Sequence, residues 1–260
     1  MELGGRYHYR PLHLKKMGEK WFMKKIVLDS YNEVSGAAAD IFAKQLKDKP
    51  NSVLGLATGS TPLGLYAELV KRFNAGEIDF SKARSFNLDE YYPIKKSHPQ
   101  SYDFFMHDNL FNKINLSESQ LPNGEAADPI AECARYEAAI KAAGGIDLQL
   151  LGIGLNGHIG FNEPAVSYPM DTNLVDLTES TLTANSRFFT SGDAQPTRAL
   201  TMGFGAIFSA KSVLLIITGA NKAPIAKKLF EGKLHTDIPA CLLLTHPNVT
   251  VIMDREANGG

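Results

Sequence analysis

The densest group of chemically useful residues lies between positions 152 and 164, where the sequence reads GIGLNGHIGFNEP. Four glycines in nine positions allow the backbone to approach a ligand closely and to adopt unusual dihedral angles. His158 is set among them, and its ordinary pKa suits proton transfer near neutral pH. Asn156 or Glu163 could hold its second ring nitrogen. A packed histidine satisfied by backbone groups is the alternative, but the surrounding glycines and polar residues favour a catalytic loop.

Asp89, in the segment NLDEY at positions 87–91, is a candidate general base. Adjacent carboxylates at a strand end point in different directions, so only one of Asp89 and Glu90 enters a site easily. Asp89 is the inward one if the strand ends at Leu88. A carboxylate near a bound sugar phosphate can remove a proton next to a carbonyl or imine carbon. The alternative interpretation is a cap for the following turn.

Residues 58–62 (TGSTP) have the composition of an anion-binding turn. We expect Thr61 to cap a helix whose first residue is Pro62, and Gly59 to allow a tight turn. Backbone amides would then face a phosphate at the positive end of the helix, with hydroxyl donors from Thr58, Ser60 and Thr61. A capped strand-to-helix turn without a ligand is the alternative. The segment has neither a Walker loop nor the three-glycine dinucleotide fingerprint.

Two cations complete the candidate site. Arg187 lies in the segment ANSRFF, and Lys222 follows the apolar run and turn that end at Asn221. An Arg fork and a Lys point charge are common complements of phosphate, although each alone is also typical of a solvated surface. Together the four places predict a pocket for proton transfer on a sugar phosphate. They require neither an organic cofactor nor a metal, since no second histidine or cysteine stands at ligand spacing.

Alternating strands and helices are predicted to position these groups. Apolar strand-like runs occupy residues 53–57, 83–88, 146–153, 212–218 and 249–253, and helical patterns include residues 130–143 and 221–230. This alternation predicts a three-layer α/β/α fold with a largely parallel, Rossmann-like sheet. Ligands of such sheets bind beyond the carboxyl ends of the strands, which is where the unusual polar residues fall.

Composition excludes several other classes. The 260 residues carry a net charge of -1, which argues against nucleic acid or an anionic membrane surface as a partner. No apolar run reaches membrane-spanning length. Two separated cysteines do not suggest a disulfide framework, so we expect a cytoplasmic protein. Residues 1–22 are interpreted as an N-terminal extension of uncertain order, and residues 23–260 as a single domain.

The sequence resembles the glucosamine-6-phosphate deaminase family from about residue 23 to residue 254. The segments that carry the resemblance are LATGSTP (56–62), FNLDEY (86–91), SYDFFM (101–106), residues 151–164 and NSRFF (185–189). The resemblance implies conversion of glucosamine 6-phosphate and water to fructose 6-phosphate and ammonium. It implies that Asp89 moves the proton between C2 and C1, and that His158 opens the sugar ring with Asn156 and Glu163 completing its relay. It implies phosphate contacts from Thr58, Gly59, Ser60, Thr61, Arg187 and Lys222.

Two departures from the family pattern affect the expectations. Some members, including allosteric hexamers, have Asp where this chain has Asn156, and an amide orients His158 without stabilising its cation. Those hexamers bind an activator through basic residues after the FNEP segment, whereas residues 166–175 here contain no Lys or Arg. We therefore expect a monomer or small homo-oligomer resembling the shorter, non-allosteric members. A lactonase acting on a related sugar phosphate and a non-catalytic sugar-phosphate sensor are the alternatives.

Overall fold

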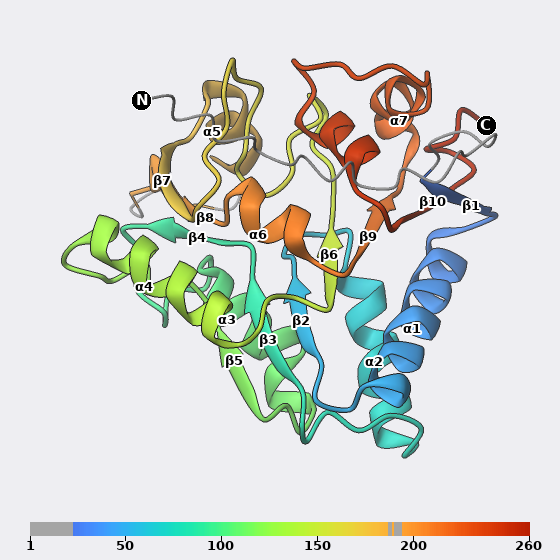
Figure 1. Ribbon diagram of the computed structural model, residues 1–260, viewed down its shortest axis with the longest axis horizontal. Helices are drawn as coiled ribbons and strands as arrows, with labels where there is room; N and C mark the ends of the chain where they lie inside the picture. The colour runs from blue at the N-terminus through green and yellow to red at the C-terminus, as the bar shows by residue number, and fades with distance from the viewer. Residues whose placement is uncertain (1–22, 187–188, 190–193) are drawn as a thin grey trace, which may run out of the picture.

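A seven-stranded parallel sheet forms the centre of the protein. The computed structural model describes residues 23–186, 189 and 194–260 (Figure 1). The strands of the sheet are β1 (Lys24–Leu28), β2 (Val53–Leu56), β3 (Arg84–Asn87), β5 (Glu118–Gln120), β6 (Leu148–Leu151), β9 (Ser212–Ile217) and β10 (Val249–Asp254). Their order is β1-β10-β9-β6-β2-β3-β5, and every neighbouring pair is parallel.

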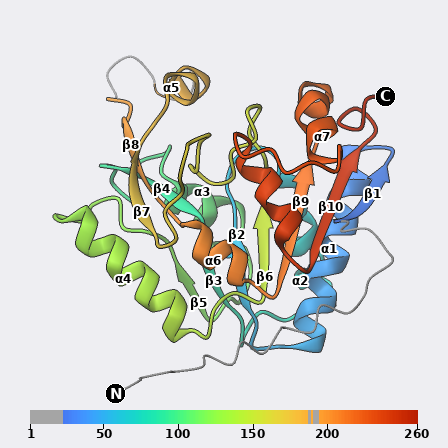
Figure 2. The ribbon, with the colours of Figure 1, turned by 45° about the horizontal axis from the view of Figure 1, so that its top comes forward.

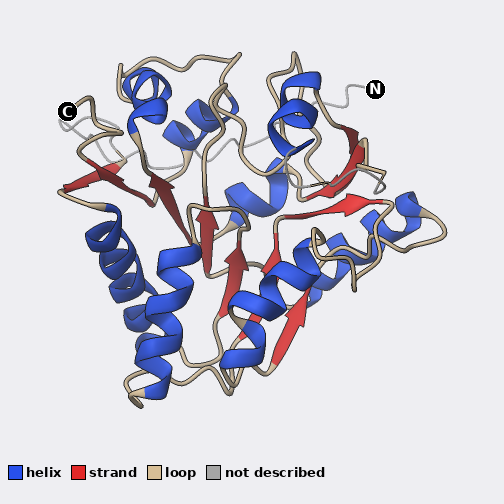
Figure 3. Cartoon of the chain, turned by 180° about the vertical axis from the view of Figure 1, so that it is seen from behind, coloured by secondary structure: helices blue, strands red, loops and turns tan. Residues whose placement is uncertain are grey.

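Helices cover both faces of this sheet, as the alternating sequence pattern predicts. Helices α1 (Tyr31–Asp48), α2 (Leu63–Asn74) and α3 (Tyr102–Asn109) lie on one face, which is towards the viewer in Figure 3. Helices α4 (Pro129–Ala142) and α6 (Phe204–Ser209) lie in front of the strands in Figure 1. The central strands are apolar on both sides because both sides are covered; all four residues of β2 and of β6 are buried. The predicted three-layer α/β/α class is confirmed.

The strand order reverses between β2 and β6. From β2 the chain adds β3 and β5 on one side, and from β6 it adds β9 and β10 on the other. At such a point the loops after the two strands separate and leave a crevice at their carboxyl ends. Those ends come forward in Figure 2, where the segments after β6 and β9 rise above the sheet. The segments after β2, β3 and β6 are three of the four places that the sequence singles out, and the turn after β9 carries Lys222 of the fourth.

A second, three-stranded antiparallel sheet was not predicted. It contains β4 (Asp89–Tyr92), β8 (Arg198–Thr201) and β7 (Asn173–Asp176), with β8 in the middle. It packs on a small apolar cluster of its own, made of Tyr91, Ile94, Phe161, Leu177 and Ala199. Asp89 is therefore the first residue of a new strand and not a residue of the turn after β3. Each strand has only four residues with polar ends, so the sequence alone does not distinguish them from loops.

The remaining elements are short. They are α5 (Glu179–Ser186), α7 (Ala223–Leu229) and the 3-10 turns η1 (Phe111–Lys113), η2 (Ala220–Lys222) and η3 (Pro239–Thr245). The helix predicted for residues 221–230 is thus divided into η2 and α7. In the described part of the chain, no helix combines the length and the apolar character that crossing a bilayer requires.

Candidate active site

The loop after β6 brings His158, Glu163 and Asn156 together, as the sequence predicts. His158 Nδ1 lies 3.2 Å from Glu163 Oε1. Asn156 donates from Nδ2 to Glu163 Oε2 at 2.6 Å, and its Oδ1 accepts the backbone amide of His158 at 3.2 Å. Glu163 is therefore the partner of the imidazole ring, and Asn156 holds both that carboxylate and the histidine backbone.

Glu163 has a further partner that sequence reasoning missed. The hydroxyl of Thr181, in α5, donates to Glu163 Oε1 at 2.6 Å. Burial alone would raise the pKa of Glu163, but hydrogen bonds and charge from His158, with the bonds from Thr181 and Asn156, lower it to about 2. The carboxylate is thus ionised at any physiological pH. The only signal for Thr181 is its place at the start of a helix, which predicts local capping and not a contact 18 residues away.

Two glycines of the loop leave room for functional side chains. A Cβ on Gly154 would lie 2.3 Å from His158 Nδ1, so the imidazole rests directly on the Gly154 backbone. Gly160 has a φ of +59°, and a Cβ there would lie 3.4 Å from Asp89 Oδ2. The first glycine accommodates the histidine ring, and the second lets the loop after β6 approach Asp89 on the neighbouring sheet.

Asp89 has the burial expected of a tuned base. Only 6% of the residue is exposed, and burial followed by the charge of Glu90 raises its pKa to about 8. In the register of the small sheet it pairs with Thr201, whose hydroxyl accepts the amide of Phe161 at 3.1 Å. A carboxyl group that titrates near neutral pH can both take up and release a proton there.

The neighbouring Glu90 points elsewhere, also as predicted. Its two oxygens accept the backbone amides of Tyr91, Tyr102 and Asp103, each at 2.9 Å. The last two amides begin α3, so Glu90 caps that helix. The Tyr102 ring then stacks on Phe161 at a centroid distance of 6.1 Å. Glu90 holds the structure beside the base and is not itself part of the candidate proton relay.

The turn after β2 presents backbone donors, although not through the cap that the sequence predicts. Within the described residues, none of the amides from position 58 to 61 donates to a protein acceptor. The expected Thr61 cap is wrong, because α2 begins at Leu63 and has no side-chain cap at its N-cap residue Pro62. Instead the amide of Gly64 donates to the hydroxyl of Tyr31 at 2.7 Å.

Of the two predicted cations, the structure describes one. Lys222 donates from Nζ to the carbonyl of Ile153 at 2.7 Å, just after β6, and burial lowers its pKa. It therefore lies between the ends of β6 and β9, close to the loop that carries His158. Arg187 lies outside the described residues.

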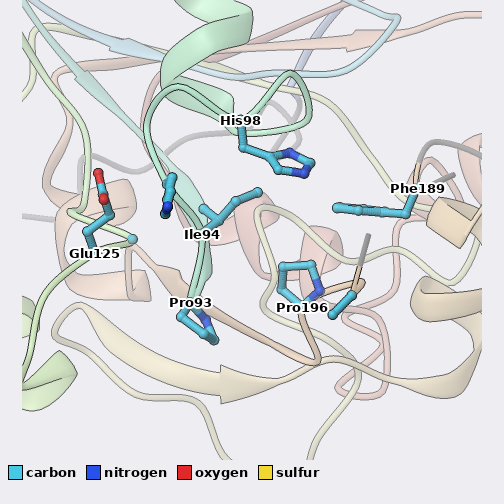
Figure 4. Close-up of a pocket in the computed structure, with 9 residues that line it drawn as sticks. Pro93, Ile94, His98, Glu125, Phe189 and Pro196 are labelled. Carbon is cyan, nitrogen blue, oxygen red and sulfur yellow. The ribbon is translucent and has the colours of Figure 1, made fainter. Parts of the chain in front are cut away.

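The described candidates gather at the carboxyl ends of four neighbouring strands, β9, β6, β2 and β3. A separate hollow of about 340 Å³ is lined by Pro93, Ile94, Phe189 and other residues near His98 (Figure 4), and none of the described candidates lines it. No cluster of three or more His, Cys, Asp or Glu side chains suited to a metal ion occurs in residues 23–186, 189 and 194–260. The arrangement brings together a histidine–carboxylate pair, a buried carboxyl group and a turn whose amides have no acceptor among the described residues.

Comparison with known proteins identifies the family. The model of the glucosamine-6-phosphate isomerases/6-phosphogluconolactonase family matches residues 29–252. The chain is 53% identical to a glucosamine-6-phosphate deaminase of Thermoanaerobacter pseudethanolicus over 237 residues, covering 90% of this chain and 94% of the relative. The chain belongs to this family. It is also 53% identical to a glucosamine-6-phosphate deaminase of Lysinibacillus sphaericus over 232 residues, covering 88% of this chain and 98% of the relative.

Solved structures separate the two branches of the family. A monomeric glucosamine-6-phosphate deaminase superposes with a TM-score of 0.88 at 46% identity, covering 91% of this chain and 99% of that one. A 6-phosphogluconolactonase from Leishmania guyanensis has a TM-score of 0.74 at 18% identity, covering 92% and 98%. The second likeness shows a shared fold only. The deaminase branch is thus favoured over the lactonase branch.

Proposed function

We propose that the site at the switch point converts glucosamine 6-phosphate and water to fructose 6-phosphate and ammonium. The chain is an enzyme of the glucosamine-6-phosphate deaminase type, as its identity of about one half with such deaminases indicates. The observation that supports this particular site is the approach of the His158–Glu163 loop to Asp89 at Gly160. This approach supports the proposal because a histidine–carboxylate pair and a buried carboxyl group lie close enough to act on one substrate.

His158 is proposed to open the pyranose ring. Opening moves a proton from the C1 hydroxyl to the ring oxygen. An imidazole can take this proton from the hydroxyl and deliver it to the ring oxygen. The ionised Glu163 stabilises the transient imidazolium at 3.2 Å, and Asn156 and Thr181 hold that carboxylate in place. The product is the open-chain aldehyde.

Asp89 is proposed to act on that aldehyde. Its carboxylate takes the proton from C2 while the substrate's ammonium group passes a proton to O1, which gives a neutral enolamine. Return of the first proton to C1 leaves an iminium group at C2. Water adds to that carbon, and the amino group leaves as ammonia and is protonated in solution. The positive charge of the substrate's ammonium group favours the ionised form of Asp89 on binding, although burial raises its pKa in the free protein.

Phosphate binding is proposed for Thr58, Gly59, Ser60 and Thr61, together with Lys222 and Arg187. The turn's amides, which have no acceptor in residues 23–186, 189 and 194–260, lie at the start of α2, where the helix dipole favours an anion. Lys222 adds positive charge from the end of the neighbouring β9 region. No cofactor is part of this proposal. We further propose one domain over residues 23–260 and a monomer, in line with the related deaminase that is monomeric.

Ammonium release from glucosamine 6-phosphate, measured together with fructose 6-phosphate, tests the proposal. Equal amounts of the two products are expected. Hydrolysis of 6-phosphogluconolactone, followed by acid release, is the comparison reaction and should be absent. Lactone hydrolysis without ammonium release would replace the deaminase by the lactonase. Binding of the sugar phosphate with neither reaction would favour the sensor.

A further inference from the structure

Tyr31 connects the start of α1 to the turn after β2. Its hydroxyl lies 3.1 Å from the carbonyl oxygens of both Ser60 and Thr61, to which it donates. The same oxygen accepts the amide of Gly64 at 2.7 Å. One side chain, about thirty residues away in the sequence, thus contacts both the turn and the first turn of α2.

These contacts engage carbonyl groups of the turn and none of its amide groups. The carbonyls of Ser60 and Thr61 face Tyr31, and the carbonyl of Ala57 accepts the hydroxyl of Tyr66. In the described part of the chain, the amides from position 58 to 61 have no protein acceptor. Carbonyl oxygens would repel a phosphate, whereas amides attract it. Tyr31 therefore occupies the last two carbonyl acceptors of the turn, Tyr66 occupies the one just before the turn, and the amide donors of positions 58–61 are left for an anion.

Tyr31 also replaces the cap that Thr61 would otherwise supply. A threonine at the N-cap position uses its hydroxyl oxygen to accept the amide three residues later, which here is Gly64. That amide already donates to Tyr31. The Thr61 hydroxyl is consequently not needed by the helix and can serve a ligand.

The position of Tyr31 is itself fixed by its surroundings. Ser30 caps α1 by accepting the amide of Glu33, and the Ser35 hydroxyl donates to the Tyr31 carbonyl at 2.8 Å. A Cβ at position 64 would lie 2.8 Å from Tyr31 Cε1 and 2.3 Å from Ser35 Oγ. Only glycine at position 64 allows the phenol to reach the turn without displacing these neighbours.

We propose that Tyr31 is a positioning residue of the phosphate site, which holds the 58–61 turn with its amides and the Thr61 hydroxyl directed to the substrate phosphate. The inference rests on the proposed function of that turn. Tyr31 does not contact the phosphate in this scheme, because its proton and its accepting oxygen are both engaged within the protein.

Tyr31→Phe tests the proposal by removing one hydroxyl and little else. Loss of these hydrogen bonds should raise KM for glucosamine 6-phosphate roughly tenfold and change kcat less than about twofold. The inhibition constant of inorganic phosphate, as a competitor, should rise by the same factor. Tyr92→Phe is the matched control, since its hydroxyl donates to the Ala126 carbonyl at 2.9 Å away from the turn. It should change neither constant.

A glycine pair provides a second test. Gly64→Ala should displace the Tyr31 ring and raise both constants in the same way, whereas Gly36→Ala, with no atom within 4 Å of the new methyl group, should not. If folded Tyr31→Phe keeps both constants within twofold, or loses kcat at unchanged KM, the inference is wrong. If the wild type releases no ammonium, the proposed function fails instead; phosphate binding measured by calorimetry then still decides whether Tyr31 supports an anion site.

Discussion

Asp89→Asn should separate the role of Asp89 in catalysis from its effect on the free energy of unfolding. Burial, and after it the charge of Glu90, raises the pKa of Asp89 to about 8, whereas in an unfolded chain it is about 3.9. Between those two pH values the folded protein holds a proton that the unfolded chain releases. Because folding takes up this proton, the free energy of unfolding decreases as the pH rises from about 4 to about 8.

The size of the effect follows from the two pKa values. Relative to a side chain that is always neutral, Asp89 should destabilise the protein by about 2 kcal/mol at pH 5 and about 4 kcal/mol at pH 7. Asparagine has nearly the shape of protonated aspartate and no charge. The variant should therefore be more stable than the wild type, and the difference in stability should be larger at pH 7 than at pH 5. It should have lost turnover, and its affinity for the substrate should stay within about an order of magnitude of the wild-type affinity.

Urea unfolding at pH 5 and pH 7 measures this difference, and ammonium release measures turnover. Asp108→Asn, at an exposed position of α3, is the control, and its stability should stay within about 0.5 kcal/mol of the wild type at both pH values. If Asp89→Asn raises the free energy of unfolding equally at the two pH values, Asp89 is already ionised in the free protein. More than a tenth of wild-type turnover would remove Asp89 from the role of base.

Three further outcomes are expected. His158→Gln should slow ring opening, so an open-chain substrate analogue should be processed relatively better than the cyclic substrate; equal impairment would argue against that role. For Glu163, whose pKa is lowered to about 2, the wild type should exceed Glu163→Gln in stability by about 3 kcal/mol at neutral pH. That difference should shrink as the pH falls from about 5 to 2 in unfolding curves. Finally, steady-state kinetics should be hyperbolic and unaffected by N-acetylglucosamine 6-phosphate, because residues 166–175 carry no Lys or Arg; sigmoidal curves that this compound makes hyperbolic would contradict the prediction.

The parallel sheet and the group of polar residues at the carboxyl ends of its strands were predictable because their signals are local. Apolar runs such as residues 212–217 identify buried strands, and the order of strands and helices along the chain gives the layers. The glycine-rich loop with His158, Asn156 and Glu163 lies within one short segment, so its internal contacts could be anticipated from the sequence.

The contacts that the sequence did not indicate join segments far apart in the chain. Thr181 reaches Glu163 from another element, and Tyr31 caps α2 from the start of α1. A serine or threonine before a proline predicts a local cap because most caps are local. At Thr61 the tertiary contact with Tyr31 replaces that local bond, which only the packing of α1 beside α2 makes possible.

The adjacent carboxylates Asp89 and Glu90 show why burial alone does not make a base. Burial raises the pKa of both, to about 8 for Asp89 and about 7 for Glu90. Glu90 accepts three backbone amides, and taking up a proton would cost it those bonds and the cap of α3. The Asp89 carboxylate accepts no hydrogen bond from the described residues, and the glycine at position 160 leaves no side chain against its Oδ2. The amide donors, and not the depth of burial, therefore decide which carboxylate is free to exchange a proton.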